Sequence, residues 1–400
     1  MRRPKFTKES IKGNSHPLKI LFLAVYAARP KMHGGFRMYL ELCNKFENEN
    51  VDVYSLVNSS APTGAGKQLV FSYPQVFKPR RLWLYLSILK TIINLRIAIS
   101  KIKPDVVIAP GQDRLNNIAL LAIKLTTKTP ALMIFHHWSL KYKFSEMCKE
   151  FIHMDRFWFL TSAEWWLTVL ALRLSTFVIS ISTFSVEQLE KLGVRKEKVA
   201  VSGVGIDYEK VEKASPATER FDGVFIGRMV VEKGIYDLIP IWKHVVEKKS
   251  DARLAVIGAE SKLEQWLSEV KRENLEKNIV YLGSIKDDER VYGLLKSAKV
   301  FVFPSHIEGF CIVVGEAMVA GLPVVCWDIP ALKEVYGKSP AVKFLPKGRL
   351  EDFSKEICHL LTDEKYRLSV SEAGRRYPLK FSWSNVARRQ LKILESIIAT

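Results

Sequence analysis

The sequence predicts an α/β protein built from two domains. Its 400 residues are more than one hydrophobic core usually organises. Apolar runs of strand length alternate with helical segments through the first half of the chain, and the alternation starts again in the second half. Continuously apolar strands are typical of parallel sheets that helices cover on both faces. Two Rossmann-like domains are therefore expected.

The first domain is predicted to span residues 1–205. Its strands are expected at Lys19–Tyr26, Val51–Leu56, Asp105–Ala109, Ala131–Phe135 and Thr176–Ile181. Helices are expected from Gly34 to Phe46, over Leu82–Ile102 and over Arg114–Leu125. The second of these helices ends before Pro104, because a proline turns the preceding residue away from helical angles.

The second domain is predicted to span residues 206–377, and a helical segment 378–400 follows it. Glycines at 203 and 205 and the Ser215-Pro216 pair loosen the chain near the boundary. The final helix, Ser382–Ile398, could pack on either domain. Strands are expected at Val224–Ile226, Leu254–Ile257, Ile279–Leu282, Val300–Phe303, Pro323–Cys326 and Val342–Leu345.

The composition is that of a globular chain. Apolar residues make up 48% and charged residues 26%, which excludes a disordered protein or a collagen-like repeat. The cysteines are odd in number, scattered and without a Cys-x-x-Cys pair, which predicts reduced thiols in a cytoplasmic chain and neither a disulfide framework nor a zinc site. They are Cys43, Cys148, Cys311, Cys326 and Cys358.

The net charge of +19 is unevenly distributed. Residues 1–215 hold 32 basic and 17 acidic side chains, a net +15, whereas residues 216–400 hold 29 and 25, a net +4. The first half is therefore expected to face an anionic partner or surface. No run reaches the ~18 consecutive apolar residues that a membrane-spanning helix needs.

The densest chemical signal follows the predicted strand Val300–Phe303. A helix is expected there over about Cys311–Ala320, with Glu308 just ahead of it and Glu316 on its second turn. The first turn of a helix suits a phosphate, because its backbone N–H groups are unpaired. Carboxylates beside that site would repel a phosphate unless they bind neutral hydroxyls. A nucleotide sugar therefore fits the pattern better than a bare nucleotide.

A second signal follows the predicted strand Val224–Ile226. It is a loop bounded by glycines at 227 and 234 that contains Arg228 and Lys233. Alone, either basic residue would be an ordinary surface charge. At the carboxyl end of a strand, beside the first signal, the pair can cradle a diphosphate.

Together these motifs resemble the family 4 glycosyltransferases, which are retaining enzymes of the GT-B fold. The family's two glutamates separated by seven residues are matched by Glu308 and Glu316, and its Gly-Arg-x-x-x-x-Lys-Gly loop by residues 227–234. The resemblance implies that the two domains face each other across a cleft and allows the last helix to pack back on the first domain. Shorter matches along the chain are Gly34-Gly35, residues 103–107, a His after Phe135, and Leu282-Gly283.

The resemblance also implies an activity, the transfer of a hexose from a nucleoside diphosphate sugar to a saccharide or lipid-linked acceptor with retention of configuration. No Asp-x-Asp motif follows a strand and no His/Cys cluster has metal spacing. Metal-independent transfer without a further cofactor is therefore expected. The Arg–Lys pair and the helix N-terminus would stabilise the leaving diphosphate in place of a metal.

The same resemblance implies residue roles. Arg228 and Lys233 would bind the donor diphosphate, Glu316 would bind the ribose hydroxyls, and Glu308 would face the transferred sugar. Gly35 would let the first domain approach the phosphates closely. Many family members have Gly where this chain has Cys311, which predicts a tighter sugar pocket. Backbone contacts to sugar and phosphate would come from Gly309, Phe310, Cys311 and Ile312.

The family's histidine near the reacting sugar is matched by His136, and the adjacent His137 is the alternative. The structural interpretation of a lone histidine here is a polar residue at the end of a strand.

Basic and aromatic residues interleave from Lys141 to Trp166. This pattern suits an anionic membrane surface, so one interpretation of the cytoplasmic chain is that it binds peripherally to the cytoplasmic face of a membrane. Core or acceptor-cleft residues with a solvated rim are the alternative.

Two other classes of function remain open. The chain could be a basic membrane- or nucleic-acid-binding protein without catalysis, although no nucleic-acid-binding module is recognisable and nucleic acid is not an expected partner. The same fold could also serve a nucleotide-sugar epimerase or a sugar phosphorylase.

Overall fold

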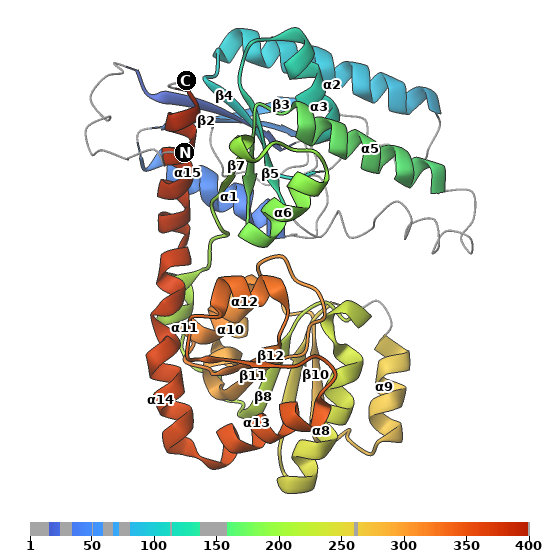
Figure 1. Cartoon of the computed structure of the whole chain (residues 1–400), viewed down its shortest axis with the longest axis vertical. Helices are drawn as coiled ribbons and strands as arrows, with labels where there is room; N and C mark the ends of the chain where they lie inside the picture. The colour runs from blue at the N-terminus through green and yellow to red at the C-terminus, as the bar shows by residue number, and fades with distance from the viewer. Residues whose placement is uncertain are drawn as a thin grey trace.

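Two parallel sheets dominate the protein, one above the other; helix α14 (Glu364–Arg375) runs beside the C-terminal sheet, and the last helix, α15 (Trp383–Ile398), runs beside the N-terminal sheet (Figure 1). The structure is a computed structural model that describes residues 16–24, 34–49, 51–58, 67–71, 81–112, 114–136, 158–259 and 263–398. Helices cover the sheets, as continuously apolar strands require. The predicted α/β fold with two Rossmann-like units is confirmed.

The N-terminal sheet has the strand order β3-β2-β1-β4-β5-β6-β7, and its neighbours pair in parallel. The sequence did not predict β3 and β7. Both are edge strands, of five and three residues, and so lack the long apolar run of a central strand. The strands are β1 (Leu18–Ala24), β2 (Val51–Asn58), β3 (Lys67–Phe71), β4 (Val106–Ala109), β5 (Ala131–Phe135), β6 (Phe177–Ser180) and β7 (Val199–Val201).

The helices of this half include two that the sequence did not predict, α5 and the short α6. Helix α5 is apolar around nearly its whole circumference, so its sequence shows no helical periodicity. The described α-helices are α1 (Gly34–Glu47), α2 (Arg81–Ile102), α3 (Arg114–Thr126), α5 (Trp158–Leu174) and α6 (Thr183–Lys191), and a 3₁₀ turn covers Lys196–Lys198.

The C-terminal sheet has the strand order β10-β9-β8-β11-β12-β13, again parallel. Each of its strands overlaps a predicted one. The strands are β8 (Phe221–Ile226), β9 (Leu254–Ile257), β10 (Ile279–Gly283), β11 (Ala298–Phe303), β12 (Val324–Trp327) and β13 (Val342–Leu345). The helices are α7 (Tyr208–Lys213), α8 (Ile235–Lys248), α9 (Leu263–Arg272), α10 (Asp288–Ser297), α11 (Ile312–Val319), α12 (Pro330–Tyr336), α13 (Leu350–Thr362) and α14 (Glu364–Arg375), with 3₁₀ turns at Val231–Lys233 and Tyr377–Phe381.

The chain crosses between the two sheets twice, and the two crossing segments are joined. The Ile206 N–H donates to the carbonyl of Phe381 at 2.7 Å, and Trp383 packs over Gly205. A Cβ atom on Gly205 would lie 1.9 Å from the Trp383 ring, so glycine is required at this approach. Helix α15 then packs against α1. The C-terminal helix thus does pack back on the N-terminal domain.

Two features of the described residues bear on the expectations for membranes and thiols. No helix in the described part of the chain is long and apolar enough to cross a membrane. Four of the cysteines lie in described segments, and each is a free thiol; Cys148 lies outside them.

Candidate functional site

The strand order of the C-terminal sheet places its topological switch point between β8 and β11. The chain leaves β8 toward β9 on one side and leaves β11 toward β12 on the other. In a parallel sheet, loops that diverge from neighbouring strands leave a crevice at the strands' carboxyl ends. The two loops that emerge there are the Gly227–Gly234 loop and the Pro304–Cys311 loop, which carry both sequence motifs.

The two loops are held together through backbone groups of Glu232. Its carbonyl accepts a hydrogen bond from the His306 N–H at 2.9 Å, and the Ser305 hydroxyl oxygen lies 3.1 Å from it. Gly234 has a φ of +71°, and a Cβ atom there would lie 1.9 Å from the carbonyl oxygen of Pro304. Only glycine fits this left-handed, close-packed position. The second glycine of the loop motif is therefore explained by the approach of the two loops.

Lys233 and Glu308 meet at this junction. The Lys233 Nζ atom lies 2.6 Å from Glu308 Oε1, and the buried Ser305 hydroxyl donates to the same oxygen at 2.7 Å. Both charged side chains are largely buried. An ammonium group has three donors, so the contact with Glu308 leaves Lys233 capacity for a second anion.

Helix α11 begins directly after this pair, at Ile312, in close agreement with the predicted start. Cys311 caps it with a φ of +65°, a conformation that costs an L-residue about 1–2 kcal/mol. Its carbonyl oxygen accepts a hydrogen bond from the Tyr336 hydroxyl at 2.8 Å, which helps to hold it there. The left-handed angle is the physical reason why glycine suits this position.

The other predicted site residues lie around this junction and across from it. Arg228 is exposed and has no ion-pair partner among the described residues. Gly309 is half-buried ahead of α11, whereas the Phe310 side chain is buried against Tyr336 and Phe381. Gly35 lies in the first turn of α1, in the other domain.

His136 directly follows β5 in the N-terminal domain. Its Nε2 atom lies 3.0 Å from the carbonyl oxygen of Pro110, which can only accept, so Nε2 carries the proton. Burial lowers the pKa of the imidazole and keeps it neutral. His137, the alternative, lies outside the described residues, as do Lys141–Phe157 of the basic and aromatic stretch.

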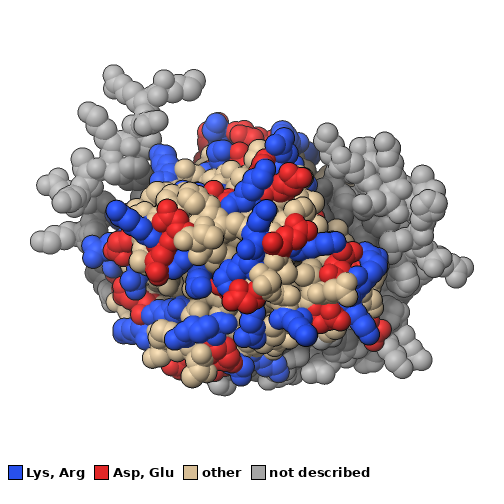
Figure 2. Space-filling model, turned by 90° about the horizontal axis from the view of Figure 1, so that it is seen from below, with Lys and Arg blue, Asp and Glu red and all other residues tan. Residues whose placement is uncertain are grey.

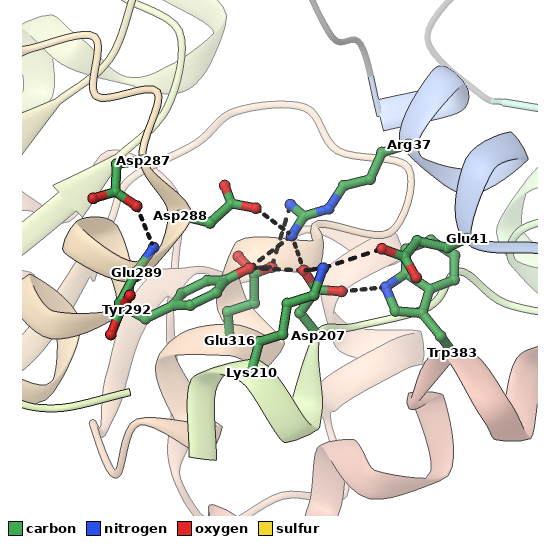
Figure 3. Close-up of polar contacts among 10 residues, drawn as sticks. All are labelled: Arg37, Glu41, Asp207, Lys210, Asp287, Asp288, Glu289, Tyr292, Glu316 and Trp383. Atoms are coloured by element: carbon green, nitrogen blue, oxygen red, sulfur yellow. Dashed lines mark hydrogen bonds and ion pairs between the residues drawn. The ribbon is translucent and has the colours of Figure 1, made fainter. Parts of the chain in front are cut away.

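Glu316 lies in a different polar cluster, which joins the two domains (Figure 3). Arg37 reaches from α1 and places its Nη1 atom 3.6 Å from Glu316 Oε1. Its Nη2 atom contacts Asp207 and lies 2.6 Å from the Tyr292 hydroxyl and 3.4 Å from Asp288 Oδ2. The Tyr292 hydroxyl lies 3.5 Å from Glu316 Oε1.

Asp207 is the centre of this cluster. It is buried in the segment that crosses between the domains, and Tyr292 donates to its Oδ2 atom at 2.9 Å. The Trp383 indole donates to Oδ1 at 2.5 Å, and Lys210 lies 3.5 Å from Oδ2. Burial opposes ionisation, but Arg37, Tyr292 and Lys210 outweigh it and lower the pKa of Asp207.

The cluster holds more carboxylates than cations, and this imbalance affects the pKa of Glu316. Asp207, Asp288 and Glu316 share Arg37 within 4 Å, while Lys210 is divided between Asp207 and Glu41. Burial raises the pKa of Glu316 to about 7; Asp207 and Asp288 add to the increase, and Arg37 opposes it.

The sequence motifs did not point to this cluster. Arg37, Asp207, Asp288 and Tyr292 come from three separate segments, and no spacing along the chain links them. The one available signal was Arg37, a charged residue two positions after the glycine pair that opens α1. Its partners could be found only from the arrangement of the domains.

A two-domain α/β protein with a basic loop and a helix N-terminus at the switch point of its second sheet has the architecture of the nucleotide-binding α/β folds. Two family models match adjacent parts of this chain: Glycosyltransferase Family 4 matches residues 32–210, and Glycosyl transferases group 1 matches residues 207–377. The chain belongs to the glycosyltransferase family that these two models describe, and its fold is GT-B.

Individual relatives support this assignment. The O-antigen chain mannosyltransferase B of Escherichia coli is 31% identical over 164 residues, which are 40% of this chain and 42% of the relative. A Campylobacter jejuni enzyme named N,N'-diacetylbacillosaminyl-diphospho-undecaprenol alpha-1,3-N-acetylgalactosaminyltransferase is 26% identical over 53% of this chain and 58% of its own length. The chain thus spans about half the length of these curated relatives.

Among solved structures, the Anabaena protein HepE in complex with UDP and glucose has a TM-score of 0.73 to this chain at 18% identity. The match covers 95% of this chain and 100% of HepE. At this identity the likeness shows the shared fold.

The raised pKa of Glu316 has a measurable effect on stability. Because the folded state holds a proton that the unfolded state releases between about pH 4.5 and 7, the free energy of unfolding falls as the pH rises through that range. Glu316→Gln removes this loss and should stabilise the protein by about 3 kcal/mol at pH 8, with little effect at pH 4.5. Urea unfolding at the two pH values measures both differences; an equal effect at both would contradict the assigned pKa.

Proposed function

We propose that the protein is a retaining, metal-independent glycosyltransferase that moves a hexose from a nucleoside diphosphate sugar to a saccharide or lipid-linked acceptor. The observation that carries this proposal is the convergence of Lys233, Glu308 and the first turn of α11 at the switch point of the C-terminal sheet. A cation and exposed helix N–H groups suit a diphosphate, while a nearby carboxylate suits a sugar hydroxyl.

The residue roles follow from this placement. Lys233 and Arg228 would neutralise the negative charge of the leaving diphosphate, a role that a metal ion has in other enzymes. Arg228 would turn toward the diphosphate from its exposed position in the loop. Glu308 would hydrogen-bond the transferred sugar. The backbone N–H groups of Gly309–Ile312 would bind sugar and phosphate. The side chain of Phe310 is buried, so only its backbone faces the site in this proposal.

The remaining roles involve both domains. Glu316 would bind the ribose hydroxyls, and Gly35, in the first turn of α1, would allow the N-terminal domain to approach the phosphates. His136 would contact the reacting sugar as a neutral imidazole. HepE, which shares this fold, is in complex with UDP and glucose, and this supports a nucleoside diphosphate donor. The names of the two curated relatives favour a saccharide or a polyprenol-linked acceptor.

A donor screen tests the proposal at its first step. UDP-, GDP- and ADP-hexoses are added singly, and a ligand that binds only the folded form raises the melting temperature. At least one of them should do so. With that donor, a transferase forms free nucleoside diphosphate and a glycosylated acceptor, whereas a phosphorylase requires inorganic phosphate and an epimerase requires no acceptor.

The diphosphate assignment predicts the effect of one double variant. Arg228→Ala with Lys233→Ala should lower kcat at least about 100-fold, because both cations that stabilise the leaving group are lost. Release of nucleoside diphosphate measures kcat. Lys243→Ala, which removes an exposed ion pair with Glu273 on the same domain, is the matched control and should leave kcat unchanged. Unchanged kinetics in the double variant would remove the assigned diphosphate clamp.

We also propose that the enzyme works at the cytoplasmic face of an anionic membrane, through the outer face of helices α2 and α5. Both helices pack on α3 and are apolar on two sides. Their buried sides face the core, and five apolar side chains on the outside are each 38–52% exposed: Ile93, Ile97, Trp166, Leu170 and Leu174. A helix that is apolar all round is usually buried or placed in lipid.

The charges of these helices support the same partner. Helix α2 carries four basic residues and no acidic one. By contrast, the face of the C-terminal domain that points away from the N-terminal domain has Lys and Arg interspersed with Asp and Glu (Figure 2). This agrees with the net charge of only +4 over residues 216–400. Basic residues near an anionic membrane contribute about 1 kcal/mol each.

Vesicle sedimentation tests this surface. The protein should sediment with vesicles that contain phosphatidylglycerol, more at low salt than at high salt. Ile97→Glu with Leu170→Glu should weaken binding at least about tenfold, because apolar contacts are replaced by charges that the lipid repels. Leu267→Glu, an exposed leucine on α9 of the other domain, is the matched control. Equal binding by the two variants would exclude the α2–α5 face as the contact.

A further inference from the structure

Glu316 depends on the opposite domain for its counter-charge. Its carboxylate is 6% exposed, on a helix of the C-terminal domain. Within the described residues, the one cation within 4 Å of it is Arg37, which α1 of the N-terminal domain supplies. Figure 3 shows the guanidinium of Arg37 entering from one side, between Asp288, Tyr292 and Asp207.

The charged groups that face Glu316 from the C-terminal side favour its neutral form. Asp207 and Asp288 are both acidic and raise the pKa of Glu316, whereas the hydrogen bond from the uncharged Tyr292 hydroxyl lowers it. Tyr336 is buried on α12, and its hydroxyl donates to the carbonyl of Cys311. Lys210, on α7, is directed to Glu41 and Asp207. Removing Arg37 would therefore leave Glu316 among like charges in a buried site.

We propose that Arg37 is a positioning residue that favours the ionised form of Glu316 for the donor ribose, so that the N-terminal domain influences the charge of a donor-binding carboxylate in the C-terminal domain. The inference rests on the function proposed above, which assigns the ribose hydroxyls to Glu316. An ionised carboxylate accepts hydrogen bonds from two hydroxyls more strongly than a neutral acid does.

A coupling between the domains follows. If the ionised form binds the nucleotide better, and Arg37 stabilises that form only when α1 lies against α11, nucleotide binding favours this domain arrangement. Reciprocity requires the converse, so that the arrangement shown in Figure 3 favours the nucleotide. Arg37 is held there chiefly by Asp207 and Tyr292, and its contact with Glu316 is the longest of the four. Glu316 can therefore engage a hydroxyl while Arg37 keeps its place.

The pH dependence of nucleotide binding tests the proposal. UDP, GDP and ADP are titrated calorimetrically into the full chain, and the tightest binder is followed from pH 5.5 to 9. In Arg37→Met, loss of the positive charge raises the pKa of Glu316, so the rise in affinity with pH should move to higher pH by about one unit or more. At pH 7 the variant should bind at least about fivefold more weakly than the wild type, and most of the loss should disappear by pH 9. The terminal phosphate titrates alike in both proteins, so only the displacement between the two profiles is used.

Further variants separate charge from structure. Arg37→Gln keeps a donor for Asp207 without the charge and should show the same displacement, whereas Arg37→Lys should stay near the wild-type profile. Arg388→Met removes an exposed ion pair between α15 and Glu49, beside α1, and should bind as the wild type does. A uniform loss of affinity at every pH in Arg37→Met and Arg37→Gln, or no loss, would overturn the proposal.

Glu316→Gln distinguishes this inference from the proposed function. If Glu316 binds the ribose, the variant should bind the nucleotide weakly and lose the pH dependence that Glu316 supplies. Wild-type affinity in Glu316→Gln would contradict the ribose assignment itself. Weak binding in Glu316→Gln together with an undisplaced profile in Arg37→Met would contradict only the role of Arg37.

Discussion

The arrangement of the two domains depends on one buried carboxylate, Asp207. It lies where the chain passes from the first sheet to the second. It forms an ion pair with a side chain of α1 and accepts hydrogen bonds from α10 and from the start of α15. A buried carboxylate without partners is strongly unfavourable, so the segments that satisfy Asp207 must stay in place. Domain orientation is thereby tied to the chemistry of a single side chain.

The proposed donor site combines two clusters near the N-terminal half of α11. Lys233 and Glu308 meet ahead of the helix, where Gly234 allows the β8 and β11 loops to approach closely. Glu316 lies one turn into the helix and faces the domain interface. The first cluster belongs wholly to the C-terminal domain, whereas the second requires both domains. The affinity for a donor that contacts both clusters would therefore depend on how the domains are arranged.

Much of the fold was predictable because buried parallel strands are continuous apolar runs. Strands such as Ala131–Phe135 were predicted to the residue, and the helix after Cys311 to within a residue. Edge strand β7 and the uniformly apolar α5 were not, since neither has the periodicity that identifies an element. The proximity of Lys233 and Glu308 could be predicted from the sequence, because both residues follow predicted strands of one parallel sheet, and the loops after such strands lie at the same edge. The Arg37 cluster was not, since no local pattern encodes the orientation of one domain on another.

The central claim, that the contact between Arg37 and Asp207 joins the domains, is tested most directly by a double-mutant cycle. The free energies of unfolding in urea are compared for the wild type, Arg37→Met, Asp207→Asn and the double variant. The structure predicts a coupling energy of at least ~1 kcal/mol, because each substitution leaves the other partner without its counter-charge. Additive effects, within ~0.5 kcal/mol, would show that the two side chains act independently and would contradict the account.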